Sequence, residues 1–175
     1  MDRLRQQRIS QHSVLINIVD QGVLIIGQPG IGKSSFALEL VSQGYQLIAD
    51  DVVELSCSNN VITGHCPSML QGLLHTRELG LISIASVFGD QAWQADHQLD
   101  VIVELTDQPQ HEVTLTTSNK TYSILDQAFP LLVLDTANPA SLSHRLLCWL
   151  AMQTKQYSAE HDLKQRQRTL MANRK

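Results

Sequence analysis

The stretch Val23–Leu40, VLIIGQPGIGKSSFALEL, constrains the fold of this chain more than any other part of the sequence. Its short apolar run, Val23–Ile26, predicts a buried strand. The residues from Gly27 to Ser34 then spell G-x-x-x-x-G-K-S, and apolar residues recur at helical spacing after them. A strand, a glycine-rich loop and a helix in this order are the context of a phosphate-binding loop, so the sequence predicts an α/β domain that contains one.

A polyphosphate concentrates several negative charges in a small volume, and the predicted loop offers what such a ligand requires. Glycines let backbone N–H groups turn inward around phosphate oxygens, and the following helix adds the positive end of its dipole. The Lys33 ammonium is expected to reach the β- and γ-phosphates of ATP, and the Ser34 hydroxyl is expected to bind Mg²⁺. The residues predicted to bind the nucleotide are Gly27, Gln28, Pro29, Gly30, Ile31, Gly32, Lys33, Ser34 and Ser35.

Strand and helix patterns alternate along the rest of the chain. A hairpin is predicted from Ser13–Val19 and Val23–Ile26, with its turn at residues 20–22, and a helix is predicted over Ser34–Ser42 with a stop at Gly44. Further strands are predicted at 45–49, 52–56, 61–63, 79–87, 99–105 and 131–134, and further helices at 69–74 and 141–153. We expect one kinase-like domain over residues 1–154 and a basic C-terminal tail, helical or frayed, over residues 155–175.

Composition excludes several classes of protein. The net charge is −4, so no basic field indicates nucleic-acid binding. Cys57, Cys66 and Cys148 are an odd number without a CxxC pair, which argues against a zinc site or a disulfide framework. The N-terminal residues MDRLRQQRIS lack the apolar core of a signal peptide, and no apolar run is long enough to span a membrane. We therefore expect a cytoplasmic protein that binds neither nucleic acid nor membrane.

Two adjacent aspartates, Asp50 and Asp51, follow the apolar run YQLIA. In open α/β sheets ligands gather at the carboxyl ends of strands, so these carboxylates are candidates for a general base and a metal ligand. Neighbouring residues on an extended strand point to opposite faces, and only one of the two is therefore expected to face the phosphates directly.

From about Gln11 to Asp90 the chain resembles the catalytic domain of HPr kinase/phosphorylase, a bacterial enzyme that phosphorylates a serine of the phosphocarrier protein HPr. The resemblance rests on the segments HSVLINIVDQGVLIIGQPGIGKSSFALELVSQGYQLIADDVVEL and GHCPSMLQGLLHTRELGLISIASVFG. Gly64 and Pro67 match a G-x-x-P turn, the segment 80–82 matches a G-[LI]-I piece, and Phe88-Gly89 match the end of the pattern. The resemblance implies a P-loop domain with a mostly β core, like the HPr kinase catalytic domain.

The resemblance also implies roles for individual residues. Asp50 matches the catalytic aspartate, which accepts the proton of the seryl hydroxyl in the kinase direction and activates inorganic phosphate in the reverse direction. Asp51 matches the second acid, which assists with the metal or with orientation. His12 matches a histidine near the catalytic aspartate, and Arg77 matches an arginine that stabilises charge on the transferring phosphoryl group. A phosphocarrier protein of the HPr type is the implied partner, and a homo-oligomer is the implied assembly.

The sequence departs from the family pattern at several positions. His75 stands where the family has a glutamate that helps to hold Mg²⁺, and Glu78 stands where it has a glycine. Imidazole is a poor ligand for this hard cation. No P-G-R-N segment precedes the predicted helix at 141–153, and we expect a short form without the family's N-terminal domain.

Three functions therefore remain open from the sequence. The first is an ATP- and Mg²⁺-dependent serine kinase, with or without phosphorylase activity, that acts on an HPr-type carrier. The second is a kinase of the same fold for another substrate. The third is a nucleotide-binding regulatory module with little transfer activity, which the histidine at position 75 favours.

Overall fold

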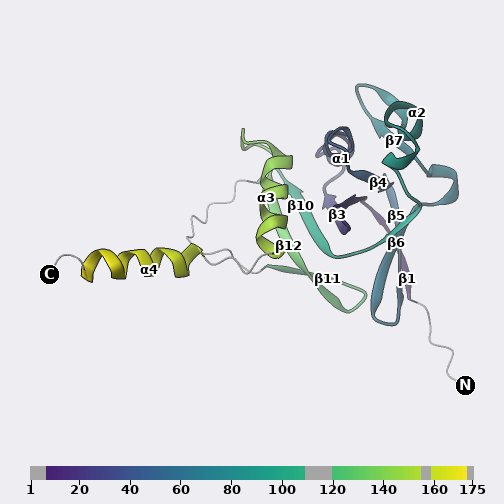
Figure 1. Ribbon diagram of the computed structural model, residues 1–175. Coiled ribbons are helices and arrows are strands. Elements are labelled where there is room, and N and C mark those ends of the chain that lie inside the picture. Colours follow the sequence, from purple (N-terminus) through teal and green to yellow (C-terminus); the bar gives the residue numbers. More distant parts are fainter. Residues whose placement is uncertain (1–6, 109–119, 155–158, 173–175) are drawn as a thin grey trace, which may run out of the picture.

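A six-stranded mixed sheet is the larger of the two main sheets in the computed structural model, which describes residues 7–108, 120–154 and 159–172 (Figure 1). Its strands lie in the order β11 (Thr121–Ile124), β12 (Gln127–Asp135), β10 (Val101–Thr106), β3 (Gln21–Gly27), β2 (Val14–Ile18) and β4 (Gln46–Ala49). β10 runs parallel to both β3 and β12, whereas β2 runs antiparallel to both β3 and β4. β3 and β4 therefore run in the same direction, and their carboxyl ends lie at one edge of the sheet.

The two faces of this sheet bury alternate residues against different partners. Val23 and Ile25 of β3 pack with apolar side chains of α1 (Lys33–Ser42) and α3 (Leu142–Thr154), whereas Leu24 and Ile26 pack toward the second sheet. Successive side chains of a strand point to opposite faces, so the continuous apolar run is what a strand covered on both sides requires. The helices predicted at 34–42 and 141–153 and the strand predicted at 23–26 are confirmed.

α1 and α3 are joined on that face by hydrogen bonds as well as by apolar packing. The hydroxyl of Ser143, which is completely buried, donates to a carboxylate oxygen of Glu39 at 2.5 Å and accepts from the side-chain amide of Gln43 at 3.0 Å. Gly44 ends α1 as predicted, with a φ of 98° and its N–H donating to the carbonyl of Val41 at 2.9 Å. The far end of α1 is thus attached to the start of α3.

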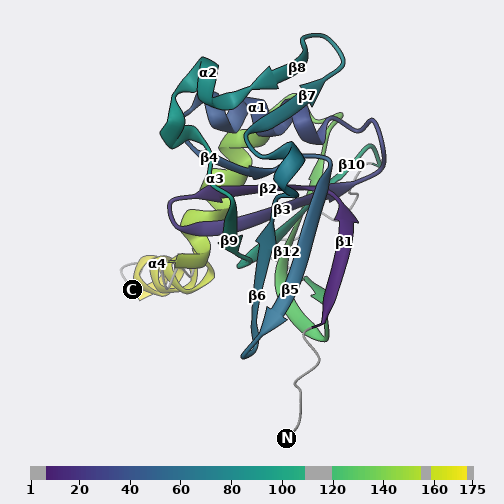
Figure 2. The ribbon, with the colours of Figure 1, turned by 90° about the vertical axis from the view of Figure 1, so that its right-hand side faces the viewer.

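The second sheet is antiparallel and contains β1 (Arg8–His12), β5 (Val52–Ser58), β6 (Val61–His65) and β9 (Asp96–Gln98), in that order (Figure 2). β5 and β6 were predicted, and the turn between them falls at Asn59 and Asn60, whose φ angles of 50° and 61° suit a two-residue hairpin. β1, β9 and β11 were not predicted, because they are short and largely exposed and lack apolar alternation.

Between β6 and β9, the chain forms η1 (Ser68–Leu70), a hairpin of β7 (Leu73–Thr76) and β8 (Gly80–Ser83), then α2 (Ile84–Phe88) and η2 (Asp90–Ala92). The hairpin and α2 lie beside α1 (Figure 2).

Three predictions of local structure were wrong. The helix predicted at residues 69–74 is limited to η1, because Gly72 takes a φ of 69° and the next residues alternate between buried and exposed as a strand. The strand predicted at residues 79–87 ends at Ser83, whose hydroxyl caps α2 by accepting from the N–H of Ser86. The first hairpin turns at Val19 and Asp20, ahead of the predicted turn at residues 20–22.

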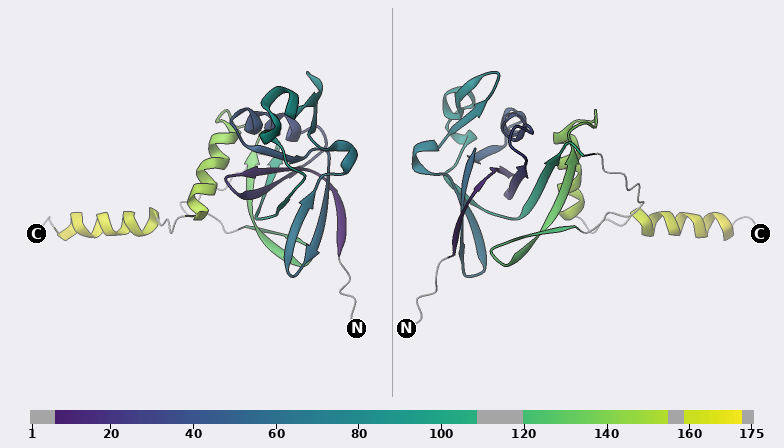
Figure 3. Two further views of the ribbon diagram at one scale, coloured as in Figure 1. Left: turned by 45° about the vertical axis from the view of Figure 1, so that its right-hand side comes forward. Right: turned by 180° about the vertical axis from the view of Figure 1, so that it is seen from behind.

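The C-terminal part of the chain contains α4 (Ala159–Ala172), which projects away from the sheets in the views of Figures 1 and 3. α3 ends at Thr154, and the domain boundary expected at this residue stays a prediction. Within the described residues, no helix is long and apolar enough to cross a membrane.

Candidate active site

The glycine-rich loop lies where β3 ends and α1 begins, as the sequence predicts. Gly30 and Gly32 have φ angles of 82° and 105°, values that residues with a side chain rarely adopt, so the path of the loop requires glycine there. Gln28 and Pro29 are exposed at the tip of the loop, and Ile31 packs against the core. The loop therefore presents backbone at its surface while one apolar residue fixes it to the domain.

Lys33 is buried inside this loop. Its ammonium group donates hydrogen bonds to the carbonyl oxygens of Gly27 at 2.9 Å and Gln28 at 3.2 Å. Burial lowers the pKa of Lys33, and the nearby carboxylates of Asp50 and Asp51 act in the opposite direction. Because a cation in this position is partly desolvated, it has a larger interaction with an incoming anion than a lysine at the surface has.

Asp50 lies at the end of β4 and is only 4 % exposed. One carboxylate oxygen accepts from the Ser34 hydroxyl at 2.7 Å, and the other accepts from the backbone N–H of His75 at 2.9 Å. Both oxygens of this buried carboxylate are therefore satisfied, and the group is held in a single orientation between the phosphate loop and β7.

Asp51 has a side chain that is 66 % exposed. Its backbone has a φ of 70°, and its carboxylate lies 2.8 Å from Nδ1 of His12. The same ring nitrogen is 2.9 Å from the Asp51 carbonyl oxygen. Of the two aspartates, Asp50 is hydrogen-bonded to the serine of the loop, whereas Asp51 is paired with His12.

Arg77 and Glu78 come from the turn between β7 and β8 and reach the same place. A methyl group built on Gly30 would lie 2.7 Å from the Arg77 guanidinium, so this side chain lies directly against the phosphate loop. A cavity of about 290 Å³ is bounded here. Its lining includes His12, Gly30, Gly32, Lys33, Ser34, Ser35, Asp50, Asp51, His75, Arg77 and Glu78. Most residues predicted for the site therefore meet in one cavity.

His75 also borders a smaller adjoining cavity of about 190 Å³, together with Ser34, both aspartates and apolar residues of the segment 70–81. Its side chain is exposed, and its contact with Asp50 is made by the backbone. The sequence singled out His75 only because it replaces a glutamate of the family pattern. No sequence signal marks a backbone N–H as a hydrogen-bond donor to a distant side chain.

Oxygen ligands suited to Mg²⁺ are present in these cavities. Ser34 and Asp51 both line them, and hydroxyl and carboxylate oxygens are the hard ligands that this ion prefers. In the part of the chain that the structure describes, no group of three or more His, Cys, Asp or Glu side chains is placed to hold a metal ion by itself.

A glycine-rich loop between a strand and a helix, with a buried aspartate hydrogen-bonded to the serine of that loop, is the arrangement of a phosphate-binding loop in an α/β domain. Comparison with known proteins makes the identification specific. The family described as HPr Serine kinase C-terminal domain matches residues 4–167, and the chain belongs to this family. The resemblance found in the sequence is thereby confirmed.

Similar proteins agree with this assignment. The HPr kinase/phosphorylase of Bordetella pertussis is 48 % identical over 95 residues, which are 54 % of this chain and 31 % of that protein. The HPr kinase/phosphorylase of Cupriavidus metallidurans is 41 % identical over 106 residues, 60 % of this chain and 33 % of that protein. The chain thus aligns with about a third of the length of these relatives.

A solved structure, that of the Hpr(Ser) kinase/phosphatase from Coxiella burnetii, matches with a TM-score of 0.73 and 27 % identity. The match covers 94 % of this chain and 97 % of that one. It confirms the predicted fold class, an α/β domain with a mostly β core.

Proposed function

We propose that this chain transfers the γ-phosphoryl group of ATP to a serine hydroxyl of an HPr-type phosphocarrier protein and also catalyses the reverse attack of inorganic phosphate on the phosphoserine. The observation that carries the proposal is the buried carboxylate of Asp50, which is hydrogen-bonded to Ser34 of the phosphate loop at 2.7 Å. This contact places a candidate base next to the residue that would lie beside the terminal phosphates. The names of the relatives support the choice of carrier.

The phosphate loop supplies the nucleotide-binding part of this proposal. Backbone N–H groups around Gly30 and Gly32 and the Lys33 ammonium would surround the β- and γ-phosphates. Ser34 and Asp51 would hold the Mg²⁺ that accompanies ATP, and the ion when bound would neutralise charge on the phosphates. Arg77, which lies against Gly30, would contact the same phosphates.

Asp50 would accept the proton from the attacking serine. As that proton leaves, the seryl oxygen bonds to the γ-phosphorus, the bond from this phosphorus to the β-phosphate oxygen breaks, and ADP departs. In the reverse direction an oxygen of inorganic phosphate attacks the phosphoserine, the serine oxygen leaves and recovers a proton, and pyrophosphate forms. Each carboxylate oxygen has two lone pairs, so Asp50 can accept a further hydrogen bond while it keeps those from Ser34 and His75.

His12 would act through Asp51. The 2.8 Å contact between them fixes the orientation of that carboxylate at the mouth of the cavity. The proposed unit for this activity is the region 1–154, and the proposed place is the cytoplasm, where ATP and phosphocarrier proteins occur. The assembly expected from the family is a homo-oligomer.

A second candidate function is a nucleotide-binding regulatory module with little transfer activity. The observation in its favour is His75, which borders both cavities, has an exposed side chain and stands where the family pattern has a glutamate that binds Mg²⁺. A kinase of the same fold for another acceptor would share the geometry of Asp50 and the phosphate loop, and only its acceptor would differ.

The test is incubation of the purified chain with labelled ATP, Mg²⁺ and the HPr-type carrier from the same cell. The expected result is label on the carrier and its loss from a carrier variant whose acceptor serine is alanine. Addition of inorganic phosphate to the labelled carrier should release labelled pyrophosphate. ATP binding without transfer to this carrier would support the regulatory module, and transfer to another protein in the same extract would support the kinase with a different acceptor.

A further inference from the structure

A groove of about 590 Å³ lies between α1 and the β7–β8 hairpin with α2, and we call it the α1 groove. One wall is a side of α1, where Ser35, Leu38 and Ser42 recur at helical spacing. The other wall comes from the hairpin and α2, which lie beside α1 in Figure 2. The transfer step proposed above uses none of the apolar residues of this groove.

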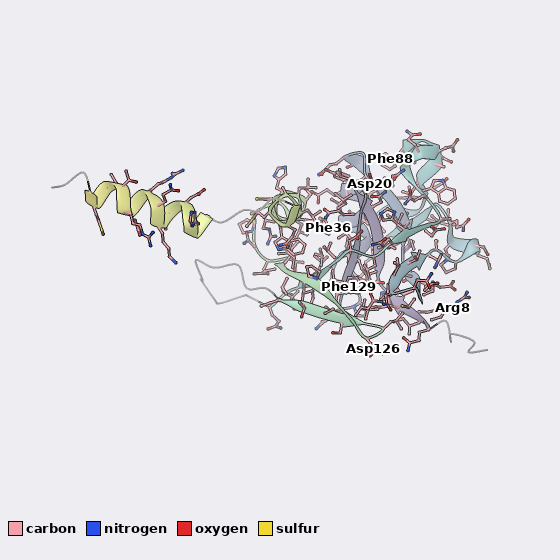
Figure 4. All side chains as sticks on the ribbon, turned by 60° about the horizontal axis from the view of Figure 1, so that its bottom comes forward. Arg8, Asp20, Phe36, Phe88, Asp126 and Phe129 are labelled. Atoms are coloured by element: carbon pink, nitrogen blue, oxygen red, sulfur yellow. The ribbon has the colours of Figure 1, made fainter. Side chains whose placement is uncertain are left out.

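The apolar lining of the α1 groove suits a small organic molecule. It consists of Leu38, Leu79, Ile82, Val87 and Phe88, of which Phe88 comes from α2 at the rim of the molecule (Figure 4). Leu79 and Val87 are 67 % and 62 % exposed, so no described part of the chain covers them. Sites for small ligands are typically clefts of roughly 300–1,000 Å³ with apolar and aromatic walls and a few polar groups. The α1 groove has this size and this composition.

Two carboxylates, those of Glu39 and Glu78, are the charged groups of the lining. One oxygen of Glu39 accepts from the hydroxyls of Ser141 and Ser143, and its other oxygen accepts no hydrogen bond from a described residue. Glu78 has no hydrogen-bond or ion-pair partner within the described ranges. The groove therefore offers acceptors and negative charge, which favour a ligand that donates hydrogen bonds and disfavour a phosphate group.

The α1 groove is continuous with the candidate active-site cavity, because Ser35, Thr76 and Glu78 border both. Ser34, the residue before Ser35, is hydrogen-bonded to Asp50, which lines the active-site cavity and the smaller adjoining cavity but not the groove. The γ-phosphate must lie near Asp50 for that carboxylate to act as the base. The three phosphates of ATP form one chain with the nucleoside at its other end, so the nucleoside leaves the cavity on the side away from Asp50. The α1 groove opens on that side, beyond Ser35.

We propose that the α1 groove binds the adenosine part of ATP, a proposal that rests on the ATP binding proposed above. Adenine is a flat body with an amino group that donates hydrogen bonds, and proteins bind nucleobases by stacking on aromatic and apolar side chains and by hydrogen bonds to their edges. Phe88 and the leucines of the lining supply the apolar contacts. Glu78, which borders both cavities, is placed to accept from the ribose hydroxyls, and Glu39, one turn beyond Ser35 on α1, to accept from the adenine amino group.

The test compares two probes in calorimetric titrations with Mg²⁺: ATP, and inorganic tripolyphosphate, which has three phosphates and no nucleoside. The groove variant carries Leu79→Asn and Val87→Asn, two exposed positions at which neutral polar side chains replace apolar ones of similar size. It should bind ATP about tenfold more weakly than the wild type, because the adenosine loses apolar contacts, and its affinity for tripolyphosphate should not change.

A matched control variant carries Val19→Asn and Val61→Asn, which are exposed and do not line the groove. It should bind both probes like the wild type. In nuclear magnetic resonance spectra of the ATP complex, the adenine C2 and C8 protons should show contacts with the methyl groups of Leu79 and Val87.

Several results would overturn this assignment. An unchanged ATP affinity in the groove variant, or an absence of contacts between adenine protons and groove methyl groups, places the nucleoside elsewhere. An equal loss of affinity for both probes shows an effect on the phosphate site and not on a nucleoside site. If the groove variant binds ATP normally but has a raised KM for the carrier, the groove binds the acceptor protein; if only its mass in solution changes, the groove is a contact between copies of the chain. A wild-type chain that binds neither probe refutes the proposed ATP site as well, whereas the other results leave that site intact.

Discussion

Replacement of Asp50 by asparagine separates the chemistry of the candidate site from its structure. The aspartate is 4 % exposed and accepts two hydrogen bonds, from the Ser34 hydroxyl at 2.7 Å and the His75 N–H at 2.9 Å. An asparagine keeps both contacts if its oxygen accepts from His75 and its amide nitrogen donates to Ser34, because a hydroxyl can also accept. No buried polar group is left unpaired, so we expect a change in the free energy of unfolding of about 1 kcal/mol or less.

The same change removes the group that would accept the seryl proton. Loss of a general base lowers the transfer rate by roughly 10² to 10⁴, which corresponds to about 3 to 5 kcal/mol in the activation barrier. ATP binding should be retained, because the loop backbone and Lys33 remain in place. Asp50→Ala is the structural contrast: it leaves both donors without an acceptor and should cost about 1–3 kcal/mol of stability for each.

Three measurements on both variants check this reasoning: the rate of label transfer from ATP to the carrier, ATP binding by calorimetry, and unfolding in urea. The reasoning predicts a slow but stable Asp50→Asn chain and a less stable Asp50→Ala chain. Wild-type transfer by Asp50→Asn would refute the assignment of the base. A loss of stability in Asp50→Asn as large as in Asp50→Ala would refute the exchange of hydrogen-bond roles with Ser34.

Four further results are expected. Lys33→Ala should weaken ATP binding tenfold or more in a calorimetric titration, since hydrogen bonds to charged groups contribute about 1.5–3 kcal/mol, and an unchanged affinity would exclude this loop as the site. His75→Glu should lower the Mg²⁺ concentration needed for transfer and raise the transfer rate, because the variant keeps the backbone N–H contact with Asp50 and adds a carboxylate. Abolished transfer would show that the imidazole itself is needed. Gly22→Ala should cost at least about 2 kcal/mol in urea unfolding, as its methyl group would lie 1.8 Å from the Gln98 carbonyl oxygen, and wild-type stability would contradict this packing. Burial raises the pKa of Cys66 from 9.0 to about 11, so the contribution of its neutral thiol to the free energy of unfolding is complete below pH 9 and is lost as pH rises toward 11. Cys66→Ala should therefore flatten the loss of stability at alkaline pH. An identical loss in the variant would show that other groups cause it.

The strand–loop–helix segment could be predicted from sequence because its determinants are local. Gly27 and Gly32 adopt positive φ angles at the two glycine positions of the motif, and the helical spacing of apolar residues after Lys33 gives the buried side of α1. The acidic pair after β4 could be placed near the loop from the general geometry of sheets, and Asp50 does lie there.

The remaining features depend on contacts between segments far apart in the chain. The order of the sheet places β2 between β3 and β4, and no local pattern specifies that neighbour. The segment 69–74 carries apolar residues that suit a short helix, but Gly72 and the pairing of β7 with β8 make its second half a strand. The contact of Arg77 with Gly30 follows from that pairing and was not predicted from spacing.

The hydrogen bonds of Ser143 to Glu39 and Gln43 have a mechanical consequence for the phosphate loop. They fix the last turns of α1 to α3, while the first turn of α1 carries Lys33 and Ser34. Because the far end of α1 is anchored, we expect α1 to stay in place when a nucleotide binds. Any rearrangement should then occur in the glycines that precede the helix. Amide protons in the middle of α1 should therefore exchange with deuterium only through global unfolding, whereas those of the loop should exchange rapidly and become protected when nucleotide is added.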